Sequence, residues 1–225
     1  MKLENHVVIE GRLVWELGGR IGGTKDAVGI GETDNPIIRD PITRRPYVPG
    51  SSLKGKLRSL LEQKYSPNSQ ETGKPCACGK CFICRMFGCG DVKTTRECSR
   101  LIFRDCPLEE ESAKRLEEAL PGSFVEVKTE IAMDRNRGAT RSGSLRQMER
   151  VPAGTAFNFE VTMRVFEGDP VKEHLERLAE AIALLEKEYL GGSGTRGYGK
   201  VRFLTRDGKQ SLAEHIRSLS QATKA

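Results

Sequence analysis

Four cysteines crowd into the nine-residue segment CACGKCFIC: Cys76, Cys78, Cys81 and Cys84. Thiolates at this spacing can surround a tetrahedral metal ion, and sites with four sulfur ligands are usually structural. Zinc is the predicted ion, and an iron–sulfur cluster is the alternative. Cys89 could replace Cys76 or Cys78 as the fourth ligand. The chain has seven cysteines, an odd number, so in a reducing compartment this cluster favours a metal over disulfides.

A second candidate for chemistry is the acidic segment GETDNPIIRDP, which stands next to a basic one. An acid among phosphate-binding groups repels a nucleic acid unless a divalent cation, Mg²⁺ or another, lies between them. Asp34 is therefore the candidate catalytic residue and ligand of that cation. The alternative for Asp34 is an Asx turn with the following Asn-Pro. For Asp40 the turn is the preferred interpretation, and Glu32 has no assigned role.

The basic segment PGSSLKGKLR has the residue types of a phosphate-binding helix start. Ser51 or Ser52 is the predicted N-cap. Backbone N–H groups at such a start, together with the helix dipole, attract anions. Lys54 and Arg58 lie four residues apart and share one helical face, which Lys56 extends. The alternative is a solvated basic helix with an ordinary serine cap.

A glycine-rich segment, GGSGTRGYGKV, begins at Gly191. Its glycines permit a close approach of the backbone to a ligand. Arg196 and Lys200 add positive charge, and Tyr198 could stack or pack. The segment lacks the spacing of a nucleotide-binding P-loop and precedes a strand rather than a helix. The alternative is a flexible connection between a helix and a strand.

The segment MDRNRGATRSGSLRQMER is polar and basic and lies between two strand-like runs, which predicts a long protruding hairpin. Arginine binds phosphate bidentately and stacks on bases. We expect Met133, Leu145 and Met148 to be exposed at the edges of this hairpin, against a partner. The alternative is a solvated loop. The hairpin arginines are Arg135, Arg137, Arg141, Arg146 and Arg150.

The remaining cysteines and the histidines are expected to play structural parts. Cys98 and Cys106 stand next to or within an apolar strand and are predicted to be packed thiols. The three histidines are His6, His174 and His215, and each is predicted to be a surface or hydrogen-bonded side chain rather than a general base.

Hydrophobic periodicity predicts the elements that position these residues. Strands are expected in HVVIEGRLVWELG, SRLIFRDC, SFVEVKTEIAMD, GTAFNFEVTMRVF and the run that follows the glycine-rich segment. Helices are expected over 52–65, in LEEESAKRLEEAL, over 171–190 and near 211–219. This order of strands and helices favours an α+β fold over a doubly wound parallel sheet.

The bulk composition limits the possible partners. The chain has 225 residues with 37 Lys and Arg against 31 Asp and Glu, a net charge of +6. A clustered excess of this size suggests an anionic partner such as nucleic acid. No apolar run approaches the roughly 20 residues that span a membrane. The N-terminal segment lacks the features of a signal peptide, so we expect a cytoplasmic protein without a membrane partner.

Taken together, these motifs resemble the backbone subunit of type III-A CRISPR (Csm) effector complexes, a family within the RAMP superfamily. The resemblance covers nearly the whole chain and is carried by IGETDNPIIRDP, YVPGSSLKGKLR, CGKCFICRMFG, the arginine-bearing hairpin and GGSGTRGYGKV. It implies one RAMP domain over residues 1–225 with a modified ferredoxin-like (RRM-like) core. It also implies a zinc-binding, cysteine-rich lid insertion at 66–90 and a thumb hairpin insertion at 128–150.

The resemblance further implies a ribonucleoprotein complex. Copies of the chain would stack head-to-tail along the guide RNA beside other Csm subunits, and the thumb would displace nucleotides of the guide–target duplex. The family's catalytic aspartate corresponds to Asp34. Guide-RNA contacts fall on Ser51, Ser52, Lys54, Lys56 and Arg58. Arg20 and Arg196 are assigned to RNA binding by their location in the chain. Three arginines of the thumb hairpin are also assigned to RNA binding: Arg135, Arg137 and Arg141.

The predicted function is therefore metal-dependent cleavage of target RNA. Unstacking a target nucleotide would free its 2′-hydroxyl to attack the adjacent phosphorus, so RNA but not DNA should be cut. Three alternatives stay open. The chain could be a non-catalytic guide-RNA scaffold, the backbone ribonuclease of the related type III-B complex, or a RAMP ribonuclease that processes precursor guide RNA.

Overall fold

The computed structural model describes residues 2–23, 36–66, 73–90 and 98–222. Its core is an antiparallel sheet of four strands in the order β10–β1–β9–β3. The strands of the sheet are β1 (Leu3–Trp15), β3 (Leu101–Phe103), β9 (Ala156–Phe166) and β10 (Val201–Leu204). Along the chain they alternate with two helices, α1 (Gly50–Tyr65) and α5 (Val171–Lys187), in the order β1–α1–β3–β9–α5–β10.

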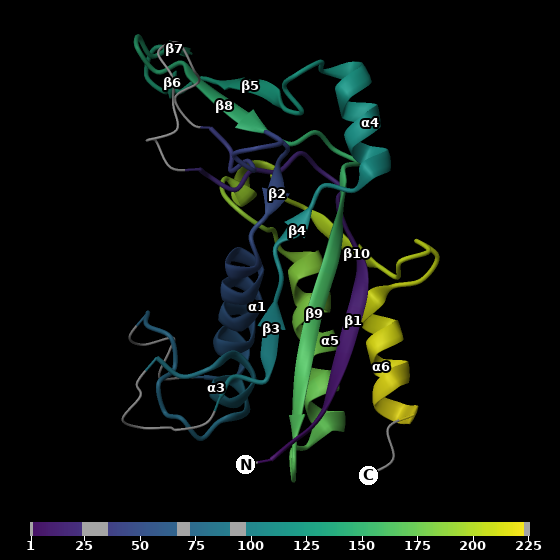
Figure 1. Ribbon diagram of the computed structural model, residues 1–225. Coiled ribbons are helices and arrows are strands. Elements are labelled where there is room, and N and C mark those ends of the chain that lie inside the picture. The colour runs from purple at the N-terminus through teal and green to yellow at the C-terminus, as the bar shows by residue number, and fades with distance from the viewer. Residues whose placement is uncertain (1, 24–35, 67–72, 91–97, 223–225) are drawn as a thin grey trace.

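This element order and strand order define the ferredoxin-like, or RRM-like, βαββαβ fold. The prediction of an α+β protein with this core is confirmed. The two long strands carry the sheet, since β1 pairs with β9 from Leu3↔Phe166 to Val14↔Ala156. In Figure 1, α5 lies behind β1 and β9, with α1 beside β3; α6 (Leu212–Ala222) packs against α5.

Alternation along the long strands decides which face the helices cover. The inward residues of β1 include Ile9 and Leu13, and those of β9 include Phe157 and Phe159, all of which are buried. Val8 points to the opposite face and is 53% exposed. The helices contribute apolar residues at the spacing that the sequence predicts. The buried helical residues are Leu53, Leu57, Leu60 and Leu61 of α1 and Leu175, Leu178, Ala179, Ile182 and Leu185 of α5.

The remaining elements are short and lie in the connections. Between β1 and α1 is β2 (Tyr47–Val48), and between α1 and β3 is α3 (Phe82–Phe87). The connection from β3 to β9 holds β4 (Cys106–Pro107), α4 (Glu110–Ala119), β5 (Glu126–Glu130), β6 (Met133–Asp134), β7 (Ala139–Thr140) and β8 (Arg146–Arg150). A 3₁₀ turn, η2 (Gly194–Arg196), precedes β10. Among the described residues, no helix has the length and apolar character needed to cross a bilayer.

The segment SRLIFRDC, predicted as one strand, divides in two. β3 joins the main sheet, whereas β4 pairs with β2 in a separate two-stranded sheet. The break lets Asp105 turn toward α1, where its Oδ1 accepts a hydrogen bond of 2.7 Å from the backbone N–H of Gly50. A divided strand therefore supplies the partner for the first turn of the helix.

The predicted serine cap of α1 is wrong. The helix begins at Gly50, and Pro49 occupies the cap position without a side-chain hydrogen bond. A side chain at Gly50 would meet the backbone carbonyl oxygens of Phe103 and Arg104 within 2.8 Å, so glycine is required where the helix start packs on the end of β3. The cap comes from Asp105, which is distant in sequence.

Candidate RNA-binding face and metal centre

The start of α1 offers fewer free donors than the sequence suggests. The N–H of Gly50 donates to the Asp105 carboxylate, and the N–H of Ser52 donates to the Pro49 carbonyl oxygen (3.0 Å). Ser51 is exposed, and its N–H has no partner among the described residues. Since a carboxylate already lies at this helix end, anion binding here depends on Ser51 and on the nearby lysines.

The three predicted cations of α1 differ in their surroundings. Lys56 pairs with Glu188 (3.5 Å) and lies over the ring of Tyr189 (4.3 Å). Lys54 is half-buried and has no ion pair with any described residue. Burial lowers the pKa of Lys54, and nearby Arg58 and Arg164 lower it further. An anion brought to Lys54 would therefore relieve an unfavourable electrostatic environment.

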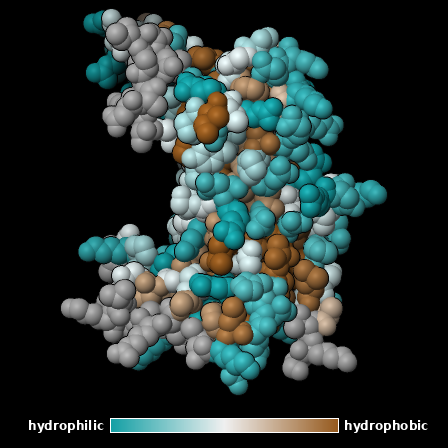
Figure 2. Space-filling view, in the orientation of Figure 1, coloured by the Kyte–Doolittle hydropathy of each residue, from teal (hydrophilic) through white to brown (hydrophobic). Residues whose placement is uncertain are grey.

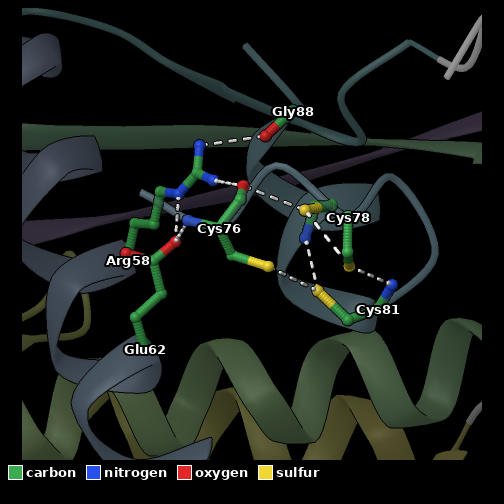
Figure 3. A network of polar contacts seen from close by, with 7 residues as sticks. Arg58, Glu62, Cys76, Cys78, Cys81 and Gly88 are labelled. Atoms are coloured by element: carbon green, nitrogen blue, oxygen red, sulfur yellow. Dashed lines mark hydrogen bonds and ion pairs between the residues drawn. The ribbon is translucent and has the colours of Figure 1, made fainter. Parts of the chain in front are cut away.

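Arg58 is held on three sides by protein groups. Its Nε donates to Glu62 Oε1 (2.8 Å), its Nη1 to the carbonyl oxygen of Gly88 (2.9 Å) and its Nη2 to that of Cys76 (2.7 Å). The side chain of Arg58 is 14% exposed and that of Glu62 is 7% exposed. In Figure 3 the guanidinium lies between α1 and the loop that carries the cysteines.

Arg20 is a second cation that has no ion pair with any described residue. Its Nε is buried without a hydrogen-bond partner in the described part of the chain, and its Nη1 contacts only the sulfur of Met148 (3.8 Å). A half-buried guanidinium with so weak a set of acceptors favours an anionic ligand. The backbone carbonyl oxygen of Arg20 accepts from the N–H of Gly192 (3.0 Å), which joins it to the glycine-rich segment.

Close packing explains two of the glycines in that segment. Gly191 has φ +84°, and a Cβ there would overlap the carbonyl oxygen of Arg20. Gly199 has φ +78°, and a Cβ there would overlap the carbonyl oxygen of Leu190. Only glycine combines these backbone angles with such close contacts. The glycine-rich segment thus packs tightly against residues 18–22 rather than serving as a flexible connector.

Glu130 of β5 joins the glycine-rich segment to the hairpin. Its carboxylate accepts from Arg196 Nη1 (2.9 Å) and from the hydroxyl of Tyr198 (2.8 Å). Arg196 is 57% exposed, whereas Tyr198 is buried. Burial raises the pKa of Tyr198 to about 12, with the Glu130 hydrogen bond adding to the shift, so the hydroxyl stays a donor at neutral pH.

The predicted hairpin is present as β5 paired with β8 and, beyond them, β6 paired with β7. Met133 and Leu145 are each 57% exposed, as expected. The expected exposure of Met148 is wrong, because it is only 7% exposed. The outer arginines are exposed and form no ion pair with any described residue; they are Arg135, Arg137, Arg141 and Arg146. Arg150, at the base, pairs with Glu126 (2.6 Å).

The ends of the segment that contains Asp34 meet near the base of the hairpin. The N–H of Gly23 donates to the Pro36 carbonyl oxygen (3.1 Å). The N–H of Ile37 donates to Glu149 of β8 (3.0 Å), which also pairs with Arg39 (3.1 Å). Asp34 and Glu32 lie outside the described residues. The Asp40 turn is confirmed, because Asp40 Oδ1 accepts from the N–H groups of residues 42 and 43.

The molecule is hollowed on the side where α1 lies. Figure 2 shows the hollow at the left, between the lobe that carries β5–β8 and the lobe that carries α3. Helix α1 therefore stands between two projecting lobes, one of which carries exposed arginines. This arrangement could hold an extended anion along the helix.

The four clustered cysteines bring their sulfur atoms within 4.8 Å of one another. The Sγ–Sγ distance is 3.9 Å for Cys76 and Cys81 and also for Cys78 and Cys84. A tetrahedron with zinc–sulfur bonds of about 2.3 Å has edges of about 3.8 Å. The donor set and its spacing fit a tetrahedral thiolate site. Cys89 is not part of this group.

Backbone N–H groups within the loop donate hydrogen bonds to two of these sulfur atoms, those of Cys78 and Cys81. The backbone N–H of Cys81 donates to Cys78 Sγ and that of Cys84 donates to Cys81 Sγ, each at 3.4 Å. Burial opposes ionisation of Cys78, but backbone N–H groups of Lys80 and Cys81 lower its pKa to about 6. Burial raises the pKa of Cys84.

Two structural predictions about other side chains fail. Cys98 is exposed rather than packed, while Cys106 is buried as expected. His174 is 1% exposed, and its Nε2 has no partner among the described residues, so it is neither a surface histidine nor fully hydrogen-bonded. Burial lowers the pKa of His174 and keeps the ring neutral.

Sequence reasoning did not find the acidic partners of the site. Glu62, Glu130 and Glu188 pair with predicted cations, while Asp105 binds the start of α1 and Glu149 pairs with Arg39. Only Glu62 carried a local signal, because it lies four residues after Arg58 on the same helix. The others pair across long stretches of sequence, where residue spacing holds no information.

Known proteins match this chain in sequence over nearly its whole length. Residues 18–202 match the RAMP superfamily. A protein of Methanocaldococcus jannaschii named CRISPR system Cms endoribonuclease Csm3 is 44% identical, covering 90% of this chain and 80% of that protein. A protein of the same name from Methanothermobacter thermautotrophicus is 42% identical, covering 90% and 85%.

Solved structures agree with the fold. A chain in the crystal structure of a Csm3–Csm4 subcomplex of the type III-A CRISPR–Cas interference complex matches with a TM-score of 0.64 and 29% identity over the full length of both chains. The crystal structure of Methanopyrus kandleri Csm3 matches with a TM-score of 0.56 and 23% identity, covering 89% of this chain and 75% of that one.

Proposed function

We infer the function from family membership: the chain belongs to the RAMP superfamily and, within it, to the Csm3 endoribonucleases of CRISPR systems. We propose that it is an RNA-cleaving subunit of a type III-A effector complex, binding guide RNA and cutting complementary target RNA. The observation that carries this proposal is the 44% identity to a named endoribonuclease over 90% of the chain.

The proposed guide-RNA contacts rest on the cations that have no ion pair within the described part of the chain. Arg20 and Lys54 are half-buried and pair with no carboxylate of the described residues, and a phosphate would supply the missing charge. Ser51 and Ser52 lie in the first turn of α1, the helix that carries Lys54. Lys56, Arg58 and Arg196 already have protein partners, so their contribution to RNA binding depends on exchanging them.

The β5–β8 hairpin is the proposed thumb. Its exposed arginines (Arg135, Arg137 and Arg141) can track phosphates, while Met133 and Leu145 offer an apolar surface to an unstacked base. The segment 128–150 is thus proposed to displace a target nucleotide, and 66–90 to form the lid.

We propose zinc at the cysteine cluster, because four sulfur donors at tetrahedral spacing suit that ion. Its role there would be to fold the loop rather than to take part in cleavage. Metal analysis of the purified protein tests this proposal. About one zinc per chain is expected, and iron with acid-labile sulfide would identify a cluster instead.

Asp34 remains the proposed catalytic residue, from the resemblance of its DNP context. A divalent cation bound there, such as Mg²⁺, would stabilise negative charge on the scissile phosphate. In the proposed reaction the 2′-oxygen of the displaced nucleotide bonds to the adjacent phosphorus as the 5′-oxygen leaves. The products are a 2′,3′-cyclic phosphate and a 5′-hydroxyl, and DNA, which lacks the nucleophile, is not cut.

The test uses the assembled complex with magnesium and a labelled target RNA. The Asp34→Ala variant should bind target as wild type does and lose cleavage. Wild-type cleavage by Asp34→Ala would leave the chain as a guide-RNA scaffold. Efficient cleavage of a target with a 2′-deoxy residue at the scissile position would exclude attack by the 2′-hydroxyl.

Proposed partners follow from the relatives. One similar chain forms a subcomplex with Csm4, which supports assembly with other Csm subunits. Stacking of several copies head-to-tail along the guide is a further part of the proposal, and mass measurement of the purified complex counts the copies. No observation here favours the type III-B complex or processing of precursor guide RNA.

A further inference from the structure

Arg58 and Glu62 bracket the cysteine loop, defined here as residues 76–88. The fork of Arg58 donates to the carbonyl oxygen of Cys76, at the start of the loop, and to that of Gly88, after α3 at its end. Glu62 Oε1 accepts from the backbone N–H of Cys76 (2.9 Å) while it accepts from Arg58 Nε. Both sides of the Cys76 backbone are thus fixed to α1, as Figure 3 shows.

Cys76 needs this support more than the other three cysteines. The N–H···S hydrogen bonds from residues 81 and 84 hold Cys78 and Cys81 within the loop, and Cys84 lies within α3. The Sγ of Cys76 lies 3.9 Å from Cys81 Sγ, and no backbone N–H of the described residues donates to it. The carbonyl oxygen of Cys76 also contacts Cys84 Sγ (3.2 Å) within the loop, and the hydrogen bonds to Arg58 and Glu62 are the contacts that fix its backbone to α1. A displaced Cys76 would leave three thiolates.

The contacts that Arg58 and Glu62 make with the cysteine loop, called the clamp from here on, are shielded by burial. The side chains of Arg58 and Glu62 are 14% and 7% exposed, so water competes poorly for their hydrogen bonds. The planar guanidinium also fixes the direction of its three contacts, which a lysine could not reproduce.

We propose that Arg58 and Glu62 are positioning residues of the metal centre: they hold Cys76 as its fourth ligand and tie metal binding to helix α1. This inference rests on the proposed metal at the cysteine cluster. It also gives Arg58 a role different from the guide-RNA contact that the sequence suggests. Groups that orient metal ligands typically change metal affinity about 10- to 100-fold when removed.

The experiment measures metal binding to the full chain in two ways. Chelator competition gives zinc affinity, and Co²⁺ substitution gives a sulfur-to-cobalt charge-transfer absorption that grows with the number of thiolate ligands. Arg58→Ala should bind zinc about 10- to 100-fold more weakly and show the cobalt spectrum of Cys76→Ser. Arg12→Ala is the matched control, since Arg12 pairs with Glu109 (2.6 Å), is 26% exposed and, among the described residues, makes no hydrogen bond or ion pair with the loop.

A double-mutant cycle tests whether Arg58 acts through Cys76. Arg58→Ala combined with Cys76→Ser should weaken zinc binding no further than Cys76→Ser alone. Glu62→Gln keeps an oxygen that can accept from Cys76 but loses the charge that holds Arg58, so it should have a smaller effect than Arg58→Ala. This milder variant also serves if Arg58→Ala does not fold.

The outcomes separate the clamp from the metal site. If wild-type protein binds neither zinc nor cobalt through its thiolates, the metal site itself is wrong, and the clamp with it. If wild type binds zinc and both Arg58→Ala and Glu62→Gln bind it as tightly as Arg12→Ala, with four-thiolate cobalt spectra, the clamp alone is overturned. Independent, multiplying effects of Arg58→Ala and Cys76→Ser would also overturn it.

Discussion

Arg58 and Arg196 each pair with a glutamate, but the two pairs lie in different surroundings. Arg58 and Glu62 are 14% and 7% exposed, and the arginine makes two further hydrogen bonds to backbone carbonyl oxygens. Arg196 is 57% exposed and contacts Glu130 (2.9 Å) through one nitrogen. A buried, fully engaged guanidinium holds the fold together. An exposed one can exchange its carboxylate for a phosphate at little cost.

The largest expected difference between these arginines is in stability. Arg58→Ala leaves Glu62 with less compensation in a buried place, so it should lower the free energy of unfolding by about 3–5 kcal/mol. Arg196→Ala should lower it by less than about 1 kcal/mol, because the pair is exposed. Urea titrations at saturating zinc compare the two variants, and equal losses would contradict the division between them.

At the base of the hairpin, Arg20 has no ion pair with any described residue, whereas Arg39 has one. Arg20→Ala should weaken guide-RNA binding by roughly tenfold or more, the size expected for losing a charged hydrogen bond, with little loss of stability. Arg39→Ala, which removes a partner of Glu149 (3.1 Å), should instead lower stability more than RNA affinity. Filter binding measures the RNA affinity of both variants, and thermal unfolding measures their stability. A loss of stability without a loss of RNA affinity in Arg20→Ala would count against an RNA role for Arg20.

A smaller effect is expected where Glu130 joins the hairpin to the glycine-rich segment. The hydrogen bond from Tyr198 lowers the pKa of Glu130 below its usual value near 4.5; burial opposes this shift, and Arg196 adds to it. A lowered pKa in the folded state means that the carboxylate stabilises the fold fully above about pH 4.5. That contribution is lost as the pH falls through the lowered value.

The rate of hydrogen exchange of the β5 amides measures how firmly Glu130 holds the hairpin to the glycine-rich segment. Glu130→Gln keeps an acceptor for Tyr198 but loses the ion pair with Arg196, so it should speed exchange modestly at neutral pH and abolish the acid dependence. Tyr198→Phe should speed exchange while leaving some acid dependence through Arg196. Identical pH profiles for wild type and Glu130→Gln would show that Glu130 does not hold the hairpin.

The sequence was sufficient for features whose cause is local. The period of Leu53, Leu57 and Leu60 predicted the buried face of α1, and the alternation in GTAFNFEVTMRVF predicted β9. The four cysteines lie close together in sequence, so their grouping in space was predictable too. The ferredoxin-like core came from the resemblance, and the order of strands in the sheet agrees with it.

The failures share one physical cause, which is a partner distant in sequence. The N-terminal donor of α1 goes to Asp105 rather than to a serine, because β3 and β4 bring that acid to the helix. Met148 is buried and contacts Arg20, 128 residues away. Arg58 has the spacing of a nucleic-acid contact and also the spacing of an ion pair with Glu62, and burial decides between them.

The central claim is that the predicted RNA-binding cations divide into those that hold the fold and those that remain available to RNA. The salt dependence of guide-RNA affinity tests it directly, because each phosphate contact on a single strand adds about 0.7 to the slope of log affinity against log salt. At saturating zinc, Arg196→Ala should reduce that slope by about 0.7 and Arg58→Ala should leave it unchanged. A reduced slope for Arg58→Ala with an unchanged slope for Arg196→Ala would contradict the account.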